Sequence, residues 1–331
     1  MRALVTGSAG FIGSHVAGAL SAAGAEVRGF DRQPLAGAAP AVEPVAGDIL
    51  DRAAVKRAMD GCDAVFHLAA VYSYDRADAG AMRAVNVEGT RVVLDAAARG
   101  GMRRRIVHTS SCGTCGPVAG RAATEDDEPP AEDLSVPYKR TKLEGERLAL
   151  RAAGEGLDVV VVNPTTPVGP GDRRPTPTGK MIADVARGRA RAWLAGGALN
   201  VVAVEDVADG HLRAHDHGRP GERYLLGGEN LAMRDVFALV ATGAGRSPPR
   251  VAIPWQVAHV GAHVGAAALG VIGREPSLLV LDEVHLARHP MTFDDAKARR
   301  ALGHRSRPAA EALGAAARAA ASSGNRGAAT A

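Results

Sequence analysis

The sequence contains little of what marks secreted, metal-binding or nucleic-acid-binding proteins. Only three cysteines occur among its 331 residues, which excludes a disulfide framework and favours a reducing compartment, the cytoplasm. Its 40 basic residues only slightly outnumber its 36 acidic ones, and they are scattered apart from Arg103 to Arg105. Because nucleic-acid sites need a clustered basic surface, we expect no nucleic-acid partner.

Aromatic residues and long apolar runs are also scarce. Aromatics make up 3% of the chain, against 46% for hydrophobic residues as a whole, so the core must consist mainly of Ala, Val, Leu and Ile. No signal-peptide pattern precedes the apolar run at Arg2 to Thr6. The stretch Val251 to Ile272 is interrupted by Pro254 and by histidines, whereas a bilayer span needs about 20 strongly apolar residues. We expect a packed helix there and no membrane span.

Metal and redox motifs are incomplete. His259 and His263 have the spacing of helical metal ligands without a nearby carboxylate or third ligand, so no metal site is expected. Cys112 and Cys115 form a Cys-x-x-Cys pair directly after a predicted strand, whereas a redox pair normally opens a helix, whose dipole lowers the thiol pKa. We interpret both cysteines as small residues that line a pocket.

What the sequence does contain is a regular alternation of short apolar runs and segments of helical period. Runs such as Val159 to Val162 lack period-two alternation, as expected of strands buried on both faces. Strands alternating with helices predict an α/β fold, a Rossmann-type doubly wound parallel sheet. In the first half, the predicted strands are Leu4–Val5, Glu26–Phe30, Ala64–Leu68, Arg105–Thr109 and Val159–Val162, and the predicted helices are Phe11–Ala23, Asp51–Met59, Met82–Arg99 and Tyr138–Ala153.

After Asn163 the pattern changes. Residues 164–177 are dense in Pro, Thr and Gly and predict a long ordered loop. We expect residues 1–165 to form the Rossmann domain, residues 166–321 mainly a smaller C-terminal substrate-binding lobe with segments that return to the main sheet, and residues 322–331 a disordered tail. In this half we predict helices at Lys180–Arg187, Val207–Ala214 and Met233–Thr242 and strands at Asn200–Val204 and Arg223–Leu226.

A glycine-rich loop lies at the first strand–helix junction. In Thr6-Gly-Ser-Ala-Gly-Phe-Ile-Gly13, Gly7 allows the tight turn, Gly10 lets the backbone approach a pyrophosphate, and Gly13 lets the helix pack on the strand. The helix N-terminus adds N–H groups and the positive end of its dipole. The loop, with Phe11 and Ile12, therefore predicts a dinucleotide site.

Acidic residues at two further strand ends suit the adenosine half of the cofactor. Asp31 ends the second predicted strand, where a carboxylate accepts hydrogen bonds from a ribose 2′-hydroxyl and repels a 2′-phosphate, which favours NAD over NADP. Arg32 keeps the alternative open, since it would stack on adenine or pair with a 2′-phosphate. Asp48, followed by Ile49, would contact the adenine amino group or simply cap the next helix.

A tyrosine and a lysine stand four residues apart in a predicted helix. Tyr138 and Lys142 therefore share one helix face. A nearby ammonium lowers a phenol pKa, which suits Tyr138 as a general acid or base and leaves Lys142 able to hold the nicotinamide ribose. Ser111 follows the strand that ends at Thr109, on the edge of the sheet where ligands bind, and would hold the same substrate oxygen.

Together these parts resemble the extended short-chain dehydrogenase/reductase superfamily, in its NAD-dependent epimerase/dehydratase branch. The resemblance implies that Ser111, Tyr138 and Lys142 are the catalytic triad and that a homodimer forms through helices Met82–Arg99 and Tyr138–Ala153. It also places Leu68, Ala69, Ala70, Asn86, Thr109 and Pro164 near the cofactor. The matching stretches are Thr6–Gly13, Asp31, Gly47–Asp48, His67–Ala70, Asn86–Thr90, Thr109–Ser111, Tyr138–Lys142 and Glu205–Ala208.

Several segments are most similar to the hopanoid-associated sugar epimerase group, which itself resembles dihydroflavonol reductases. They are Tyr138–Lys142, Asn163–Asp172, Pro175–Gly179, Tyr224–Asn230, His289–Pro290 and Phe293–Arg300.

The chain departs from sugar-nucleotide enzymes at two positions. Leu199 stands where those enzymes usually carry a diphosphate-binding Arg, and Thr166 stands where they commonly carry an Asn. The loss of both removes charge-assisted anchors. Arg173 and Lys180 remain as substitute substrate anchors.

The sequence predicts an NAD-dependent oxidoreductase that acts on an alcohol or ketone carbon of a small molecule: a polyol, a sugar derivative or a ketone. The alternative is a sugar or nucleotide-sugar epimerase or dehydratase with tightly bound NAD. A non-catalytic dinucleotide sensor is disfavoured, because such sensors typically lose the Tyr–Lys pair that this chain has.

Overall fold

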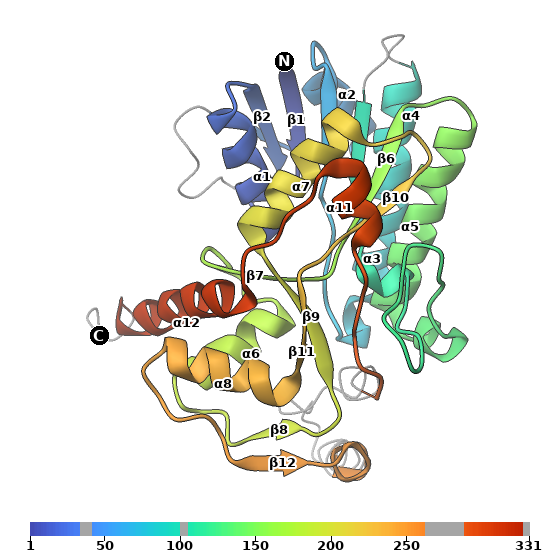
Figure 1. Ribbon diagram of the computed structural model, residues 1–331. Helices are drawn as coiled ribbons and strands as arrows, with labels where there is room; N and C mark the ends of the chain where they lie inside the picture. The colour runs from blue at the N-terminus through green and yellow to red at the C-terminus, as the bar shows by residue number, and fades with distance from the viewer. Residues whose placement is uncertain (34–41, 100–104, 262–287, 327–331) are drawn as a thin grey trace.

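The computed structural model describes residues 1–33, 42–99, 105–261 and 288–326. An upper part consists of a parallel sheet between two sets of helices, and a smaller lobe lies below it (Figure 1).

The main sheet has seven strands, all parallel, in the order β10-β6-β5-β4-β1-β2-β3. The predicted doubly wound α/β sheet is therefore confirmed. The strand order reverses between β1 and β4, and the crevice outside the carboxyl ends at such a point is the usual ligand site. The strands are β1 (Arg2–Thr6), β2 (Glu26–Asp31), β3 (Val42–Ala46), β4 (Ala64–His67), β5 (Arg105–Thr109), β6 (Val159–Pro164) and β10 (Arg223–Leu226).

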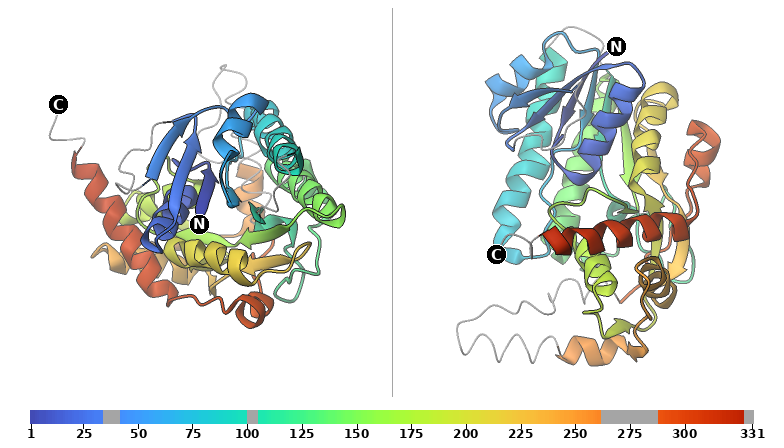
Figure 2. Two further views of the ribbon diagram at one scale, coloured as in Figure 1. Left: turned by 90° about the horizontal axis from the view of Figure 1, so that it is seen from above. Right: turned by 90° about the vertical axis from the view of Figure 1, so that its left-hand side faces the viewer.

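Helices cover both faces of this sheet, as the view from above shows (Figure 2, left). In β1, Ala3 and Val5 belong to the apolar cluster on one face and Leu4 to the cluster on the other. Burial on both faces explains why the strands are apolar without alternation. The helices are α1 (Phe11–Ala22) and α7 (Val204–His217) on one face, and α2 (Arg52–Met59), α4 (Thr90–Arg99) and α5 (Pro137–Gly154) on the other.

The lower lobe is built from segments that follow β6, and its last helix lies across the boundary with the main sheet (Figure 2, right). Its three main helices pack together around Val236, Val240 and Leu313. They are α6 (Pro177–Ala186), α8 (Met233–Gly243) and α12 (Ala309–Arg326). Two small sheets complete it: β11 (Glu229–Ala232), β9 (Ala198–Ala203) and β7 (Thr166–Val168), and the pair β12 (Val251–Ile253) and β8 (Ala192–Leu194).

Short helices connect these elements. They are η1 (Arg76–Asp78), α3 (Ala79–Arg83), η3 (Cys112–Thr114), η4 (Ala131–Ser135) and α11 (Ala296–Leu302). A π-helical turn, η2 (Ala84–Gly89), joins α3 to α4. The helix predicted from Met82 to Arg99 thus contains a π turn, which places Asn86 in an irregular backbone segment of a kind often found at functional sites.

Three predicted segments need correction. The loop predicted at 164–177 contains strand β7, because these residues pair with β9, a partner that the local composition does not reveal. The helix predicted at 251–272 is confirmed at residues 255–261, but it begins later than predicted, because residues 251–253 form strand β12; residues 262–272 lie outside the described residues. The tail predicted from residue 322 begins too early, because α12 continues to Arg326.

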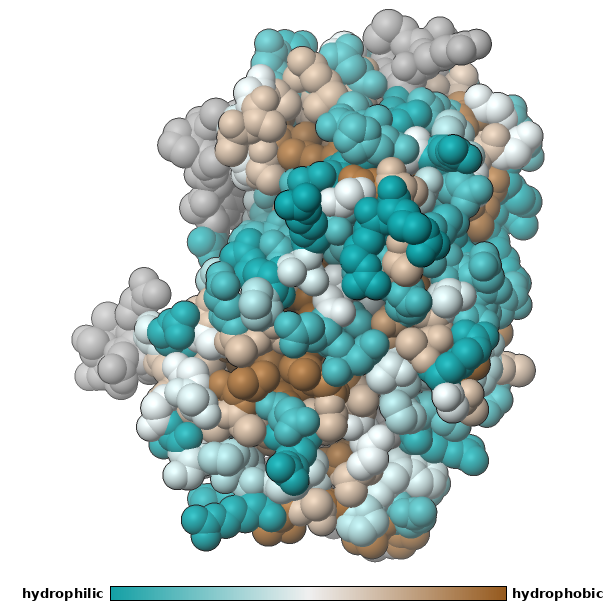
Figure 3. All heavy atoms as spheres, in the orientation of Figure 1, coloured by the Kyte–Doolittle hydropathy of each residue, from teal (hydrophilic) through white to brown (hydrophobic). Residues whose placement is uncertain are grey.

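Exposed hydrophobic side chains gather in the lower lobe. Among the described large hydrophobic side chains, Val251, Val257 and Val260 have the highest exposed fractions. Figure 3 shows hydrophilic residues over α7 and α11 and hydrophobic residues lower on the same face. None of the described helices combines the length and apolar character that crossing a bilayer requires.

Candidate active site

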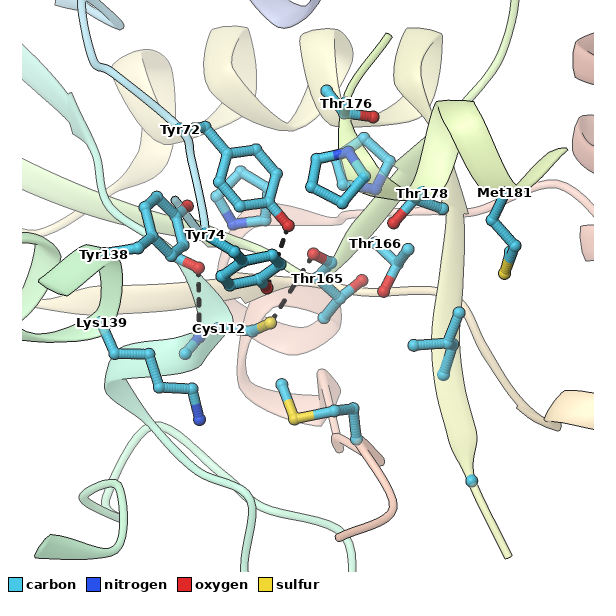
Figure 4. A pocket seen from close by; sticks show the side chains of 18 of the residues that line it. Tyr72, Tyr74, Cys112, Tyr138, Lys139, Thr165, Thr166, Thr176, Thr178 and Met181 are labelled. Atoms are coloured by element: carbon cyan, nitrogen blue, oxygen red, sulfur yellow. Dashed lines mark hydrogen bonds between the residues drawn. The ribbon is translucent and has the colours of Figure 1, made fainter. Parts of the chain in front are cut away.

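A cavity of about 760 Å³ opens at the carboxyl ends of the main sheet, between the sheet and the lower lobe. Its position matches the ligand crevice expected where the strand order reverses. Figure 4 shows tyrosines on one side of it and Thr166, Thr178 and Met181 on the other. The predicted site residues that line it are Gly7, Gly10, Phe11, Ile12, Gly13, Leu68, Ala70, Thr109, Ser111, Tyr138, Lys142, Pro164 and Thr166.

The glycine loop is shaped by close backbone contacts. Gly7 has a φ of 70°, and a Cβ there would come within 2.7 Å of the Ala69 nitrogen. A Cβ on Gly13 would overlap the carbonyl oxygen of Gly7. No side chain caps the N-terminus of α1 at Gly10, so the first N–H groups of this helix are left for a ligand. The loop therefore fits the pyrophosphate of a dinucleotide.

Asp31 is held at the edge of this loop. Its carboxylate accepts hydrogen bonds from the backbone N–H of Ala9 (3.1 Å) and of Gln33 (2.9 Å). The exposed Arg32 side chain lies 3.6 Å from Asp48. Neither Asp31, Arg32 nor Asp48 lines the cavity itself, which reaches the glycine loop beside them.

Three other predicted cofactor residues, Asn86, Ala69 and Ile49, do not line the cavity. Asn86 is buried, accepts a hydrogen bond from the Val71 N–H (2.8 Å), and donates to the Val71 carbonyl (3.0 Å) and to Thr141 (3.1 Å). It therefore ties the segment after β4 to the helix that carries Lys142. Ala69 donates its N–H to the Thr6 hydroxyl (3.2 Å). Ile49 is a core residue in the apolar cluster beside α2.

Tyr138 and Ser111 meet in the cavity. Burial raises the pKa of the Tyr138 phenol, and the hydrogen bond with the Ser111 side chain acts against this rise. The lowering of the Tyr138 pKa expected from Lys142 is therefore wrong for this structure. The phenol is buried among uncharged groups, so it stays protonated near neutral pH and is ready to donate a proton.

The ammonium group of Lys142 bonds to the backbone at the end of β5. Its ammonium donates to the Thr109 carbonyl oxygen at 2.7 Å, and the residue is 7% exposed. Burial lowers the Lys142 pKa to about 8, against the opposing effect of Glu146. Glu146 itself is buried and bonded to Arg223 (2.7 Å), Thr114 (2.7 Å) and Asn163 (2.6 Å). This network fixes the helix that presents both Tyr138 and Lys142.

The two substitute anchors lie outside this cavity. Arg173 lines a second, smaller cavity of about 250 Å³, and Lys180 lines neither of the two. The residues 164–177 fold back through β7 and the start of α6, and this backbone path sets where Arg173 points. Neither residue lines the cavity that contains Tyr138, and their role as substrate anchors stays a prediction.

Sequence reasoning missed most of the substrate side of the cavity. Tyr72 and Tyr74 line it, so three of the chain's four tyrosines lie here. The Tyr72 ring lies 4.4 Å from the Tyr138 ring, centroid to centroid, and its hydroxyl donates to Tyr74 at 3.1 Å. The signal was two tyrosines within three residues, directly after the His67–Ala70 stretch, in a chain with few aromatics. The lower-lobe lining, such as Trp193 and Phe237, carries no local motif.

The cysteines and histidines give no sign of redox or metal chemistry. Burial raises the Cys112 pKa to about 12, and it also raises that of Cys115. Cys112 lines the cavity, as predicted, whereas Cys115 packs in an apolar cluster with Phe293. In the parts of the chain that the structure describes, no group of three potential ligands could hold a metal ion; His263 lies outside them.

Three buried histidines beneath the cavity predict acid sensitivity. Burial lowers the pKa of His67 to about 3 and of His211 to about 4, and it lowers that of His108 well below the usual 6.5. The fold thus holds them neutral, while the unfolded chain protonates them near pH 6.5. Stability should fall as the pH drops from 6.5 towards 4, by about 1.4 kcal/mol per pH unit for each histidine. Urea unfolding across this range measures the slope.

His211→Gln should reduce that slope by one histidine's share. His211 bonds the Val207 carbonyl (2.7 Å) and the Thr109 hydroxyl (2.9 Å), partners that an amide also satisfies. The matched control is His217→Gln, because His217 is exposed on the same helix. An unchanged slope in His211→Gln would contradict the assignment.

The fold and this site define a class of protein: enzymes of the extended short-chain dehydrogenase/reductase superfamily, with a Rossmann glycine loop and a Tyr–Lys pair beside one cavity. Residues 3–227 match the model of the NAD-dependent epimerase/dehydratase family, and the chain belongs to that family.

Three relatives cover most of the chain. A protein described as a dihydroflavonol 4-reductase, from Synechocystis sp., is 37% identical over 90% of this chain and 88% of its own length. Sterol demethylase protein B from Methylococcus capsulatus is 39% identical over 77% of this chain and 78% of its own. A 4-hydroxy-2-methyl-3-oxo-4-farnesyl-3,4-dihydroquinoline-1-oxide ketoreductase from Stigmatella aurantiaca is 34% identical over 93% and 92%.

Solved structures share the whole fold. Gox2253 superposes with a TM-score of 0.83 at 36% identity, covering 98% of both chains. DesIV, a dTDP-glucose 4,6-dehydratase from Streptomyces venezuelae with NAD bound, superposes with a TM-score of 0.78 at 25% identity, covering 99% of this chain and 98% of its own. The chain is thus an enzyme of an NAD-dependent family.

Proposed function

We propose that this enzyme interconverts a ketone and a secondary alcohol, with NAD as its redox partner and Ser111, Tyr138 and Lys142 as its catalytic residues. The observation that carries the proposal is that Ser111, Tyr138 and Lys142 line the same cavity as the glycine loop. A phenol and a hydroxyl in one cavity can together bind the oxygen of a carbonyl group.

The residues of this chain form a site that can hold the cofactor. When bound there, NAD supplies the two-electron step, in which a ketone gains a hydride at carbon and a proton at oxygen while NADH becomes NAD⁺. In the proposed arrangement, residues 1–165 bind the cofactor and residues 166–321 mainly cover the substrate. Gly7, Gly10 and Gly13 with Phe11 and Ile12 hold the pyrophosphate, Asp31 and Asp48 face the adenosine, and Leu68, Ala70, Thr109, Lys142 and Pro164 border the nicotinamide half.

The protein residues then have separate tasks at the reacting oxygen. Ser111 donates a hydrogen bond to it and keeps it beside the Tyr138 hydroxyl. Tyr138, whose pKa is raised by burial, gives its proton to the oxygen as the carbon is reduced. Lys142 lies one helical turn away, where its ammonium would hold the ribose of the nicotinamide half. A protonated Tyr138 is the form that reduction of a ketone requires.

The proposed NAD preference has its own test in Asp31→Asn. This change removes the charge that repels a 2′-phosphate, and the single amide oxygen keeps the hydrogen bond from only one of the two N–H groups, that of Ala9 or that of Gln33. NAD affinity should fall about tenfold, the cost of about 1.4 kcal/mol in lost charge-assisted bonding, and NADP affinity should rise. Titration calorimetry with both cofactors measures the ratio. Arg32→Gln is the comparison. If Arg32→Gln abolishes NADP binding while Asp31→Asn changes neither cofactor affinity, Arg32 rather than Asp31 contacts the ribose.

The second candidate is an epimerase or dehydratase that oxidises and re-reduces its substrate on one retained NAD. The likeness to DesIV with NAD bound favours it. Cofactor stoichiometry separates the two. An oxidoreductase exchanges NAD freely and consumes NADH in step with product, whereas the second candidate keeps NAD through purification and turns over without net change in added NADH. The second pattern would overturn the proposal.

We also propose a homodimer through the exposed faces of α4 and α5, which pack beside each other on one side of the sheet, and a cytoplasmic location, supported by the low cysteine count of three in 331 residues. Light scattering of the purified enzyme tests the dimer.

A further inference from the structure

The substrate side of the cavity is apolar on several independent elements. Met181 on α6, Trp193 on β8, Leu199 on β9, Met233 and Phe237 on α8, and Met291 before α11 all line it. Thioether and aromatic side chains adapt to irregular apolar ligands and offer them large contact areas. Met181, one residue of this wall, lies across the cavity from the tyrosines (Figure 4).

The charged side chains that line the cavity already have partners within the protein. Among the described lining residues none is Arg, Asp or Glu, and the two lysines are Lys139 and Lys142. Lys139 forms a buried ion pair with Asp133 (2.6 Å) and donates to the Gly116 carbonyl (3.2 Å). Lys142 donates to the Thr109 carbonyl (2.7 Å). The diphosphate of a nucleotide sugar, buried on the substrate side of this cavity, would lack the charge-assisted hydrogen-bond donors that its charges need.

The tyrosine side supplies a flat surface beside the reacting point. The Tyr72 ring stands 35° from the Tyr138 ring at 4.4 Å, and Tyr74 lies edge-on to Tyr138 at 6.1 Å. Tyr72 is 39% exposed, so part of its ring is left uncovered at the cavity. Polar contacts come from uncharged hydroxyls, including Thr166 and Thr178. Val257 lines the cavity and is 60% exposed, which gives the cavity an apolar rim.

We propose that the substrate is an uncharged, largely apolar ring compound, a fused-ring or aryl ketone or its alcohol, whose ring lies on Tyr72 and whose body fills the space against Trp193, Met181 and Phe237. This inference rests on the proposed function, because it assigns the substrate class of the same site. The proposed class excludes nucleotide sugars. The side chain at position 199, a leucine in this chain, distinguishes binding of the two classes of substrate. An arginine there would supply the charge that the wall lacks.

Binding to the NAD⁺-loaded enzyme tests the substrate class without turnover, since a ketone and NAD⁺ cannot react. Titration calorimetry would compare cyclohexanone, 1-tetralone, a four-ring steroid ketone and UDP-glucose. Affinity should rise at least tenfold from cyclohexanone to the larger ring ketones, and UDP-glucose should bind at least a hundredfold more weakly than the best of them. Equal affinities across the ketones, or tighter binding of UDP-glucose, would overturn the inference.

Variants locate the binding surface. Tyr72→Ala and Trp193→Ala should each weaken the largest ketone about tenfold and leave cyclohexanone and NAD⁺ unchanged. Because Trp193 lies on an edge strand and Tyr72 on a loop, at least one of the two should fold normally, as circular dichroism would show. Leu199→Arg should weaken the ring ketone and strengthen UDP-glucose. Its matched control is Leu50→Arg, at an exposed leucine away from the cavity, which should change neither.

Failure of this inference and failure of the proposed function give different results. Weak or unselective binding of ring ketones, combined with Tyr138-dependent consumption of NADH on a polar ketone, rejects the apolar substrate and keeps the oxidoreductase. Selective ring binding that depends on Tyr72 and Trp193, without hydride transfer from NADH or NADPH to any ring ketone, keeps the ligand class and rejects the oxidoreductase.

Discussion

Tyr138→Phe should lower the rate of ketone reduction about 1,000-fold while leaving NAD affinity within about twofold. General acid catalysis by a positioned side chain contributes roughly a hundred- to ten-thousandfold, and this change removes the only proposed proton donor. Phenylalanine keeps the ring that packs against Tyr72 and Tyr74, so the cavity retains its shape. Stopped-flow measurement of NADH oxidation, with NAD binding measured separately, separates chemistry from binding.

Tyr224→Phe is the matched control, because it removes the same hydroxyl from the one tyrosine that does not line the cavity. Tyr224 is 1% exposed in β10, and its hydroxyl accepts a hydrogen bond from the Arg219 N–H at 3.1 Å. This variant should lose about 1 kcal/mol of stability and keep its rate. If Tyr138→Phe retained more than a tenth of the wild-type rate, Tyr138 would not be the proton donor.

Gly13→Ala should cost about 3 kcal/mol of stability and lower NAD affinity about 100-fold. The added Cβ would overlap the carbonyl oxygen of Gly7, and a backbone atom cannot rotate away as a side chain can. The loop would have to move out of the shape that receives the pyrophosphate. Urea unfolding and NAD titration measure the two effects.

Gly18→Ala serves as the control for that change. Gly18 lies in the same helix, and a Cβ there meets nothing within 4 Å. Alanine should therefore stabilise the enzyme by about 0.5–1 kcal/mol through helix propensity, with NAD affinity unchanged. Equal losses in the two variants would mean that the contact between Gly7 and Gly13 has no special role.

Local patterns were enough to predict six of the seven strands of the main sheet, all except β3, and the residues on the glycine-loop side of the cavity. Strands β5 and β10 begin and end as predicted, because buried strands read as continuous apolar runs with polar boundaries. The glycines, Ser111, Tyr138 and Lys142 come together because they stand at strand ends and on one helix face, and strand order alone gathers such positions at the carboxyl edge of a parallel sheet.

The substrate side depended on contacts that no local pattern encodes. Trp193 and Phe237 reach the cavity only because β8 and α8 pack in a lobe whose strands pair over long sequence separations. Local sequence also did not show that Arg173 and Lys180 would lie outside the larger cavity. The Tyr138 pKa was misjudged because spacing predicts proximity to Lys142 but not burial, and burial is the larger effect here.

Deuterium transfer from labelled NADH to a ring ketone tests the central claim most directly. The enzyme would be incubated with 1-tetralone and with NADH deuterated on either face of nicotinamide C4, and the alcohol analysed by mass spectrometry. The account predicts one deuterium at the carbinol carbon from one labelled form only, and no product from Tyr138→Phe. Conversion of a nucleotide sugar on retained NAD, with no deuterium in any ring alcohol, would contradict it.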